Sequence, residues 1–177
     1  MRHIELKDGR SLFIRKVALD DAPELLDFVE AVAGESDNLT FGPGEFGLSL
    51  AQEEEYLRNL AAAENQAYFV GIVDGEIIAS ITFAGGKRAR TRHSGEFGIS
   101  VRKACWGIGV GGAMIDALLD WARGTGIVEK VSLRVRTDNE RAILLYRRKG
   151  FETEGILRGE FKIGERLYDL MAMSRFI

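Results

Sequence analysis

The sequence predicts an α+β fold, with a mixed, mostly antiparallel β-sheet that contains one central parallel pair of strands. Three strand-like runs lie between residues 68 and 101, and the tight turn signal Asp74-Gly75 joins the first two as an antiparallel hairpin. A glycine-rich turn, an amphipathic helix and one more strand follow, and together they form a single strand–helix–strand crossover. Hairpins followed by one crossover place the parallel pair in the middle of the sheet.

The chain opens with two extended segments and a helix. Residues 3–6 and 11–17 are expected to be strands on either side of the turn signal Lys7-Asp8-Gly9. The acidic pair Asp20-Asp21 directly precedes Pro23, a combination typical of a helix start. Apolar residues then recur at helical spacing, which predicts a helix with one buried face.

A loop and a second helix come next. Segment 34–47 contains four glycines and a proline and is expected to be irregular. Ser49-Leu-Ala-Gln52 matches a capping box, which predicts a helix from there to about Ala63. The run Glu53-Glu54-Glu55 lies near the positive end of this helix, so a solvated first turn explains it without any function.

The remaining elements follow from the same patterns. The helix after the glycine-rich turn has an apolar face, and two final strands are expected to be hinged at Ile163-Gly164. The predicted strands are 68–73, 77–83, 96–101, 130–136, 152–162 and 166–174, and the last helix is predicted over 139–149. The Lys/Arg-rich segment 85–93 is expected to be a solvated hairpin tip, although it could also steer a ribosomal or nucleic-acid-associated target.

Length and composition fit one domain over residues 1–177. The chain is 46% hydrophobic, and a chain of this size buries roughly 70% of its unfolded surface. Its formal net charge of −3 argues against a dedicated nucleic-acid-binding protein, because that class carries a basic surplus. A single cysteine excludes an internal disulfide and, with only two histidines, argues against a Cys/His metal site.

No targeting or membrane segment is recognised. The N-terminal sequence MRHIELKDGR lacks the apolar stretch of a signal peptide, and the longest apolar runs, such as 67–73, are too short to span a bilayer. We therefore expect a cytoplasmic protein with no membrane partner and no bound metal.

The most informative segment is the turn Gly107-Ile-Gly109-Val-Gly111-Gly112 between a strand and a helix. Glycine has no Cβ and tolerates positive φ, so the backbone amides of such a turn can approach an anion closely. The following helix start leaves its first amides unpaired and carries a partial positive charge. The segment therefore predicts a phosphate or diphosphate cradle.

Three alternative interpretations of this turn can be weighed from the sequence. Gly107, Gly109 and Gly112 match the dinucleotide pattern GxGxxG of nicotinamide or flavin oxidoreductases, but only one crossover follows, whereas that fold requires successive crossovers. The P-loop pattern fails, because no Lys-Ser or Lys-Thr follows the glycines. The glycines could also serve only a tight strand-to-helix turn.

Two motifs at matching positions strongly resemble the Gcn5-related N-acetyltransferase (GNAT) superfamily. Its coenzyme loop, Gln/Arg-x-x-Gly-x-Gly/Ala, corresponds to Trp106, Gly109 and Gly111, with Trp106 departing from the usual Gln or Arg. Its second motif, Asn-x-x-Ala-x-x-Leu-Tyr-x-x-x-Gly-Phe, corresponds to 139–151, and the element order fits over nearly the whole chain. The resemblance implies a sheet of about seven strands flanked by about four helices.

The resemblance also implies the co-substrate, acetyl-CoA, and where it binds. The diphosphate would lie on the loop amides, and the pantetheine arm would pair with the strand end like an extra strand. The residues implied are Ile99, Ser100, Val101, Trp106, Gly107, Ile108, Gly109, Val110, Gly111, Gly112, Ala113, Asn139, Ala142, Tyr146 and Lys149.

The implied reaction is direct transfer of the acetyl group to a primary amine in a ternary complex. By resemblance, Tyr146 is the general acid for the leaving thiolate and Glu96 the general base for the amine. Each has a plainer interpretation, because Tyr146 falls on a helical apolar stripe, and Glu96 could be an exposed carboxylate paired with Arg88 or Arg92. A catalytically silent coenzyme A sensor of the same fold is the alternative function.

The acceptor pocket is placed by resemblance between the early helical loop and the last strands. Acidic groups there would favour a cationic amine or a peptide N-terminus, although a solvated loop is also often acidic. The candidates are Glu30, Glu35, Asp37, Asn38, Tyr168 and Asp169. A homodimer is a further expectation drawn from the family.

Overall fold

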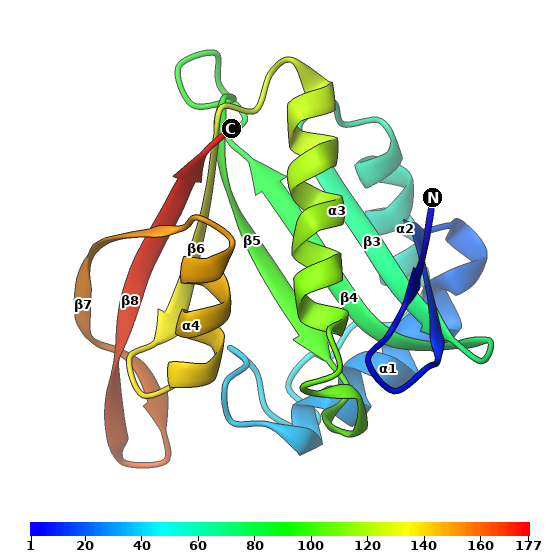
Figure 1. The fold of residues 1–177 in the computed structure, drawn as a ribbon, viewed down its shortest axis with the longest axis horizontal. Helices are drawn as coiled ribbons and strands as arrows, with labels where there is room; N and C mark the ends of the chain where they lie inside the picture. Colours follow the sequence, from blue (N-terminus) through cyan, green and yellow to red (C-terminus); the bar gives the residue numbers. More distant parts are fainter.

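The computed structural model describes residues 1–177 as an eight-stranded sheet with helices on both faces (Figure 1). The strand order is β1-β2-β3-β4-β5-β6-β8-β7. The strands are β1 (Arg2–Glu5), β2 (Ser11–Lys16), β3 (Gln66–Val73), β4 (Glu76–Gly85), β5 (Ser94–Val101), β6 (Lys130–Arg136), β7 (Glu152–Ile163) and β8 (Arg166–Phe176). The helices are α1 (Ala22–Glu35), α2 (Leu50–Ala61), α3 (Val110–Thr125) and α4 (Glu140–Arg148), with 3-10 turns at Leu19–Asp21 and Lys103–Cys105.

The predicted fold class is confirmed, and the strand count needs one correction. Every strand pair is antiparallel except β5–β6, which is the single parallel pair near the middle of the sheet. The expected count of about seven strands is one too low. The short N-terminal hairpin joins the sheet completely, with β1 pairing to β2 and β2 to β3, so its first strand forms one edge.

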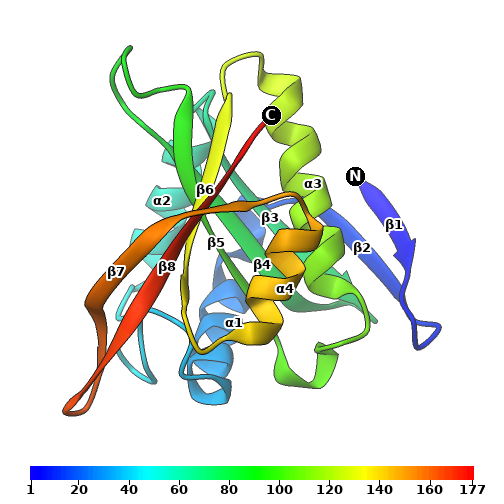
Figure 2. The same ribbon diagram turned by 60° about the vertical axis from the view of Figure 1, so that its left-hand side comes forward.

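The parallel pair separates after its first few residues. β5 and β6 are paired only at Ser94–Lys130, Gly95–Val131 and Glu96–Ser132. Beyond Glu96, β5 remains paired with β4 as far as Val101, and β6 remains paired with β8 as far as Arg136. The two strands therefore diverge toward their carboxyl ends, as the views in Figures 1 and 2 show. One edge of β5 is left without a partner strand along residues 97–101.

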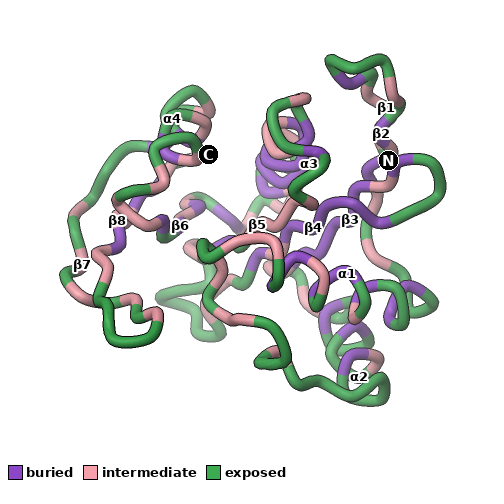
Figure 3. The backbone as a smooth tube through the Cα atoms, turned by 90° about the horizontal axis from the view of Figure 1, so that it is seen from below, coloured by how far each residue is buried: buried purple, intermediate pink, exposed green.

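The helices form a layer on each face of the sheet. Figure 3 shows α3 and α4 on one face and α1 and α2 on the other. The larger core packs α3, through fully buried residues such as Met114 and Leu118, against Ile81 and Phe83 of β4. A smaller core lies beneath α1 and α2. None of the helices combines the length and apolarity needed to cross a membrane.

The α2 helix starts as predicted but does not keep its whole acidic run in solvent. Ser49 and Gln52 form the expected capping box, with the Ser49 amide donating to Gln52 Oε1 at 2.9 Å. Glu53, however, is only 2% exposed, so the expectation of a solvated first turn is wrong for this residue. Glu53 is followed at positions i+4 and i+7 by Leu57 and Leu60, which places all three on the buried face.

Candidate active site

The glycine turn takes the backbone conformation that its sequence predicts. After β5, a 3-10 turn leads to Trp106, and α3 begins at Val110. Gly107 has φ of 86° and Gly109 has φ of 109°, both in the region that other residues rarely adopt. A Cβ at Gly109 would meet no atom within 4 Å, so the backbone there is open to an approaching ligand.

The amides of this turn have no partner within the protein. The amides of Gly107, Ile108 and Gly109 donate no hydrogen bond to a protein group, and the first bond of α3 runs from Ala113 to the carbonyl of Gly109 at 3.1 Å. A carbonyl group fixes the turn instead: the carbonyl of Ile108 accepts a hydrogen bond from the Lys7 amide at 3.1 Å. These free donors lie at the positive end of α3, where phosphate binding is favoured.

The Trp106 side chain is anchored to the end of β5, and its expected contact with the cofactor stays a prediction. Its indole Nε1 donates to the carbonyl of Val101 at 2.7 Å, so the side chain folds back onto the end of β5. The ring remains 36% exposed. The unpaired edge of β5, with Ile99 and Ser100, thus runs directly toward Trp106 and the glycine turn.

The start of α4 brings a cation to the same place. Asn139 caps the helix, with Oδ1 accepting from the Ala142 amide at 3.2 Å. The Arg141 guanidinium lies over the Trp106 ring, 5.4 Å from its centroid, and Nη2 is 3.2 Å from where a Cβ of Gly107 would stand. Arg141 forms no ion pair in the structure. It was not among the predicted residues, although its place in the α4 first turn, two residues after Asn139, is a signal that could have found it.

Lys149 is the predicted cofactor residue with the most evident competing role. Its Nζ lies 2.5 Å from a carboxylate oxygen of Asp116 on α3, so the charge is already paired. Its alkyl chain also covers Gly112, where an added Cβ would meet Lys149 Cε at 3.4 Å. In this structure Lys149 therefore joins α4 to α3.

Tyr146 packs in the core, as its plainer interpretation expected, and its role as the general acid stays a prediction. It is 7% exposed and packs edge-on against Phe97 and Phe151, with ring centroids 5.9 and 6.1 Å away. Burial alone raises the pKa of the Tyr146 phenol to about 12, so no protein charge or hydrogen bond acts on its hydroxyl. Phe97 is the first residue of β5 after the parallel pairing ends. Tyr146 therefore lies beside the point where the two strands begin to diverge.

Glu96 lies on the opposite face of the sheet from Tyr146. The alternation of β5 buries Phe97 against Tyr146 and turns Glu96 toward the α1–α2 side. Its carboxylate is half exposed and lies 3.3 Å from Arg134 Nε, and Arg134 also approaches Glu160 at 3.6 Å. The expected pairing with Arg88 or Arg92 is wrong, because Arg92 instead pairs with Glu64.

A cavity of about 600 Å³ opens at the carboxyl ends of β5 and β6. It is lined by residues 35–38, Trp106, Arg136 and residues 138–141, so it includes the predicted Glu35, Asp37, Asn38 and Asn139. Glu35 is already engaged, since it accepts from Arg102 Nε at 2.9 Å and from the Lys103 amide at 2.6 Å. Burial acts to raise the pKa of Glu35, but these hydrogen bonds and charges outweigh it and the pKa is lowered.

Arg136, which was not predicted, organises this side of the cavity. Its guanidinium bonds both carboxylate oxygens of Asp138 and the carbonyl of Asp37, and it stacks 3.9 Å from the ring centroid of Tyr168. Tyr168 thereby lies against Arg136, but it is not among the residues that line the cavity. These contacts join the α1–α2 loop to β6 and β8, which sequence spacing cannot show.

Two other acceptor candidates are held elsewhere. Glu30 accepts from the Gly44 amide at 3.0 and 3.1 Å, which ties α1 to its own loop. Asp169 accepts from the Gly159 amide at 2.8 Å and so bridges β7 and β8. No group of three or more His, Cys, Asp or Glu side chains is placed to hold a metal ion.

Comparisons with known proteins agree with this geometry. A model of the Acetyltransferase (GNAT) family matches residues 36–151. A solved acetyltransferase of the GNAT family from Streptococcus pneumoniae is 30% identical, with a TM-score of 0.91 and coverage of 94% of this chain and 99% of that one.

Two curated relatives match over shorter stretches. The L-amino acid N-acetyltransferase AaaT of Escherichia coli is 31% identical over 86 residues, which is 49% of this chain and 53% of AaaT. The N-alpha-acetyltransferase RimI of Mycobacterium tuberculosis is 36% identical over 109 residues, which is 60% of this chain and 64% of RimI. The chain thus matches between about half and two thirds of the length of these relatives.

Proposed function

This chain belongs to the acetyltransferase (GNAT) family, and on that premise we propose that it transfers the acetyl group of acetyl-CoA to a primary amine. The amine attacks the thioester carbonyl directly, with both substrates bound at once. A carbon–nitrogen bond forms, the carbon–sulfur bond breaks, the amine gives up a proton, and the sulfur leaves as a thiolate that is then protonated.

One observation carries the proposal: the partnerless edge of β5 ends at a turn of free amides. An extended ligand with amide groups can pair with that edge, and a diphosphate can bind the donors of residues 107–109. Arg141 adds an unpaired positive charge beside Gly107. The family pattern has Gln or Arg at position 106, where this chain has Trp106, so Arg141 supplies a polar side chain that this position lacks. The cradle therefore fits the diphosphate through its backbone and through α4.

Tyr146 serves the leaving sulfur in this proposal. With its pKa raised to about 12, the phenol stays protonated throughout the physiological range. An alkyl thiol has a pKa of about 8.5, so complete proton transfer from the phenol would be uphill by roughly 5 kcal/mol. Tyr146 consequently stabilises the developing thiolate as a hydrogen-bond donor, and the final proton comes from solvent.

Glu96 receives the proton of the amine, directly or through water. An alkylamine has a pKa of about 10.4 and arrives charged, so it must be deprotonated before attack. The position of Glu96 supports this role, because it lies on the α1–α2 face while the phenol lies on the other face. The two proton-handling groups are then separated by the sheet, and a β5 amide near Ile99 or Ser100 can stabilise the oxyanion.

The test combines binding and turnover. Acetyl-CoA should raise the melting temperature of the protein, because it binds only the native state, and an amine library should include acceptors that release free thiol. Gly109→Ala should weaken both effects, since its φ of 109° imposes a strain of about 1–2 kcal/mol on any other residue. Gly124→Ala is the matched control, because Gly124 lies within α3 with open space around it.

Each outcome is informative. A temperature shift without amine-dependent thiol release would overturn the proposed enzyme and favour a coenzyme A sensor. No shift at saturating acetyl-CoA would overturn the binding site itself. Equal effects of Gly109→Ala and Gly124→Ala would show that the turn is not where the diphosphate binds.

A further inference from the structure

The buried carboxylate of Glu53 is an enclosed polar group that the proposed reaction leaves without a role or a partner. Glu53 is 2% exposed, and its Oε2 is the only enclosed side-chain nitrogen or oxygen that forms no hydrogen bond. It takes part in none of the ion pairs of the protein. An enclosed carboxylate without a compensating charge is costly, so its burial calls for a cation or a proton.

Two tyrosines lie beside this carboxylate. Tyr56 is one helical turn further along α2 and is 40% exposed. Tyr68 of β3 is buried, and its ring centroid is 6.3 Å from that of Tyr56, with the planes tilted by 60°. The negative charge of Glu53 contributes to raising the pKa of both phenols, after burial as the larger cause. Aromatic faces next to a carboxylate form an environment that favours a cation.

This cluster lies on the amine side of the proposed active site. α2 covers the same face of the sheet as α1, opposite α3 (Figure 3). On that face Tyr68 is aligned with Thr82 of β4, and Thr82 is aligned with Gly98 of β5. Gly98 is exposed, and a Cβ there would meet only Thr82 Oγ1 at 3.6 Å. The sheet surface is therefore open at Gly98, two strands away from the buried Tyr68.

We propose that Glu53, with Tyr56 and Tyr68, binds a second positive charge of the acceptor, which makes a dicationic primary amine the preferred substrate class. Two strand spacings separate Tyr68 from Gly98, roughly 10 Å. A cation at Glu53 is therefore too far from β5 to be the reacting nitrogen. Identifying this ligand as an acceptor rests on the proposed function, whereas the cation site itself does not.

The experiment compares hexamethylenediamine with hexylamine, which has the same chain and a single charge. Calorimetry in the presence of coenzyme A measures the affinity of each amine for wild type, Glu53→Gln and Glu55→Gln. Glu55→Gln is the control, because it alters an exposed carboxylate two residues further along α2. Wild type and the control should bind the diamine at least about tenfold more tightly than hexylamine, and Glu53→Gln should lose that preference. The melting temperature of Glu53→Gln should be no lower than that of wild type, because the variant removes a buried unpaired charge.

The outcomes separate this inference from the proposed function. Equal binding of the two amines by wild type, or an unchanged preference in Glu53→Gln, overturns the cation site even if thiol release is observed. Diamine binding that depends on Glu53, without thiol release for any amine, supports the cation site and overturns the acetyltransferase. A preference for L-amino acids or peptide N-termini that Glu53→Gln leaves intact also overturns the site.

Discussion

Replacing Tyr146 with phenylalanine removes a single hydroxyl beside the point where β5 and β6 diverge. The ring keeps its contacts with Phe97 and Phe151, and the hydroxyl bonds no protein group. The free energy of unfolding should therefore change by less than about 0.5 kcal/mol, which is about 1–2 °C in melting temperature for a chain of this length. Any loss of activity in Tyr146→Phe then reports on chemistry.

The size of that loss follows from the environment of the phenol. With a pKa of about 12, Tyr146 does not give up its proton to a thiolate of pKa about 8.5. In the proposed reaction it donates a hydrogen bond to a charged group, which is worth about 1.5–3 kcal/mol. The rate of acetyl transfer should fall by about 10- to 150-fold, which is less than the upper range for full general acid catalysis.

The assay is the rate of thiol release in single turnovers, which isolates the chemical step from product release. Wild type and Tyr146→Phe should keep similar affinities for acetyl-CoA. The wild-type rate should show no high-pH decline from Tyr146 below about pH 11, since the phenol remains protonated there. A rate within twofold of wild type would refute the assigned role and leave Tyr146 as a packing residue. A melting temperature lower by many degrees would refute the structural reasoning.

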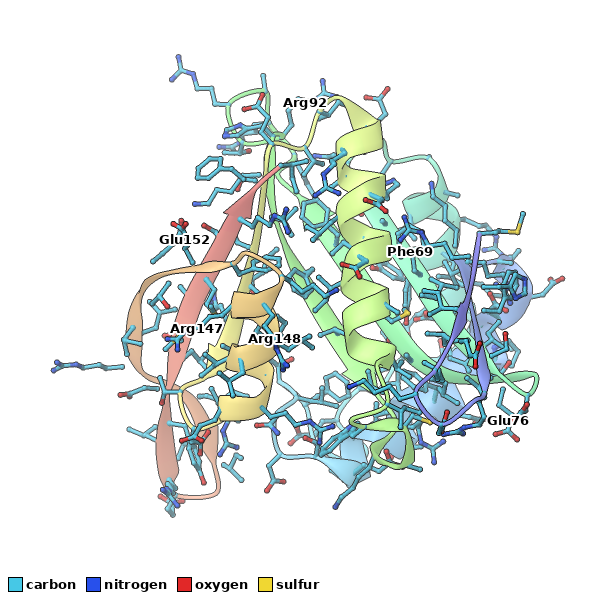
Figure 4. The ribbon with its side chains drawn as sticks, in the orientation of Figure 1. Phe69, Glu76, Arg92, Arg147, Arg148 and Glu152 are labelled. Carbon is cyan, nitrogen blue, oxygen red and sulfur yellow. The ribbon has the colours of Figure 1, made fainter.

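Two further predictions concern Arg141 and Glu35. Arg141→Ala should weaken acetyl-CoA binding and make that binding less dependent on salt. Arg147 lies on the side of α4 away from α3 (Figure 4), so Arg147→Ala should change neither. Equal effects of the two variants in calorimetry would exclude a phosphate contact by Arg141. The pKa of Glu35 is lowered in the folded protein, so its contribution is present above its unfolded pKa and is lost as pH falls through the folded value. Glu35→Gln should therefore be less stable than wild type by about 1 kcal/mol at pH 7, and the difference should vanish as pH falls through the lowered pKa of Glu35. A constant difference in urea titrations would contradict this.

The features that the sequence predicts best are those encoded locally. The capping box of Ser49 and Gln52 and the positive φ of Gly107 and Gly109 each depend on residues close together in the chain. The single crossover also follows from the order of the elements, so the fold class and the glycine turn are predictable. The count of about seven strands, which the family resemblance implied, is one too low, although all eight strands fall on segments that local patterns predict.

The features that the sequence does not predict depend on contacts between distant elements. Arg136 joins Asp37, Asp138 and Tyr168 from three parts of the chain, and no local pattern indicates that meeting. Glu96 pairs with Arg134 across the parallel strands, whereas nearby arginines were expected. The burial of Glu53, in contrast, is predictable from the sequence, because Glu53 lies at helical spacing from the apolar Leu57. The neighbouring Glu54 and Glu55 made the whole run look solvated.

Amide hydrogen exchange, followed residue by residue with and without acetyl-CoA, tests the central claim most directly. The amides of Gly107, Ile108 and Gly109 have no protein acceptor, so they should exchange fast in the free protein. Saturating acetyl-CoA should slow their exchange and that of the unpaired β5 edge at residues 99–101. Unchanged exchange at the glycine turn, with protection appearing elsewhere, would contradict the account.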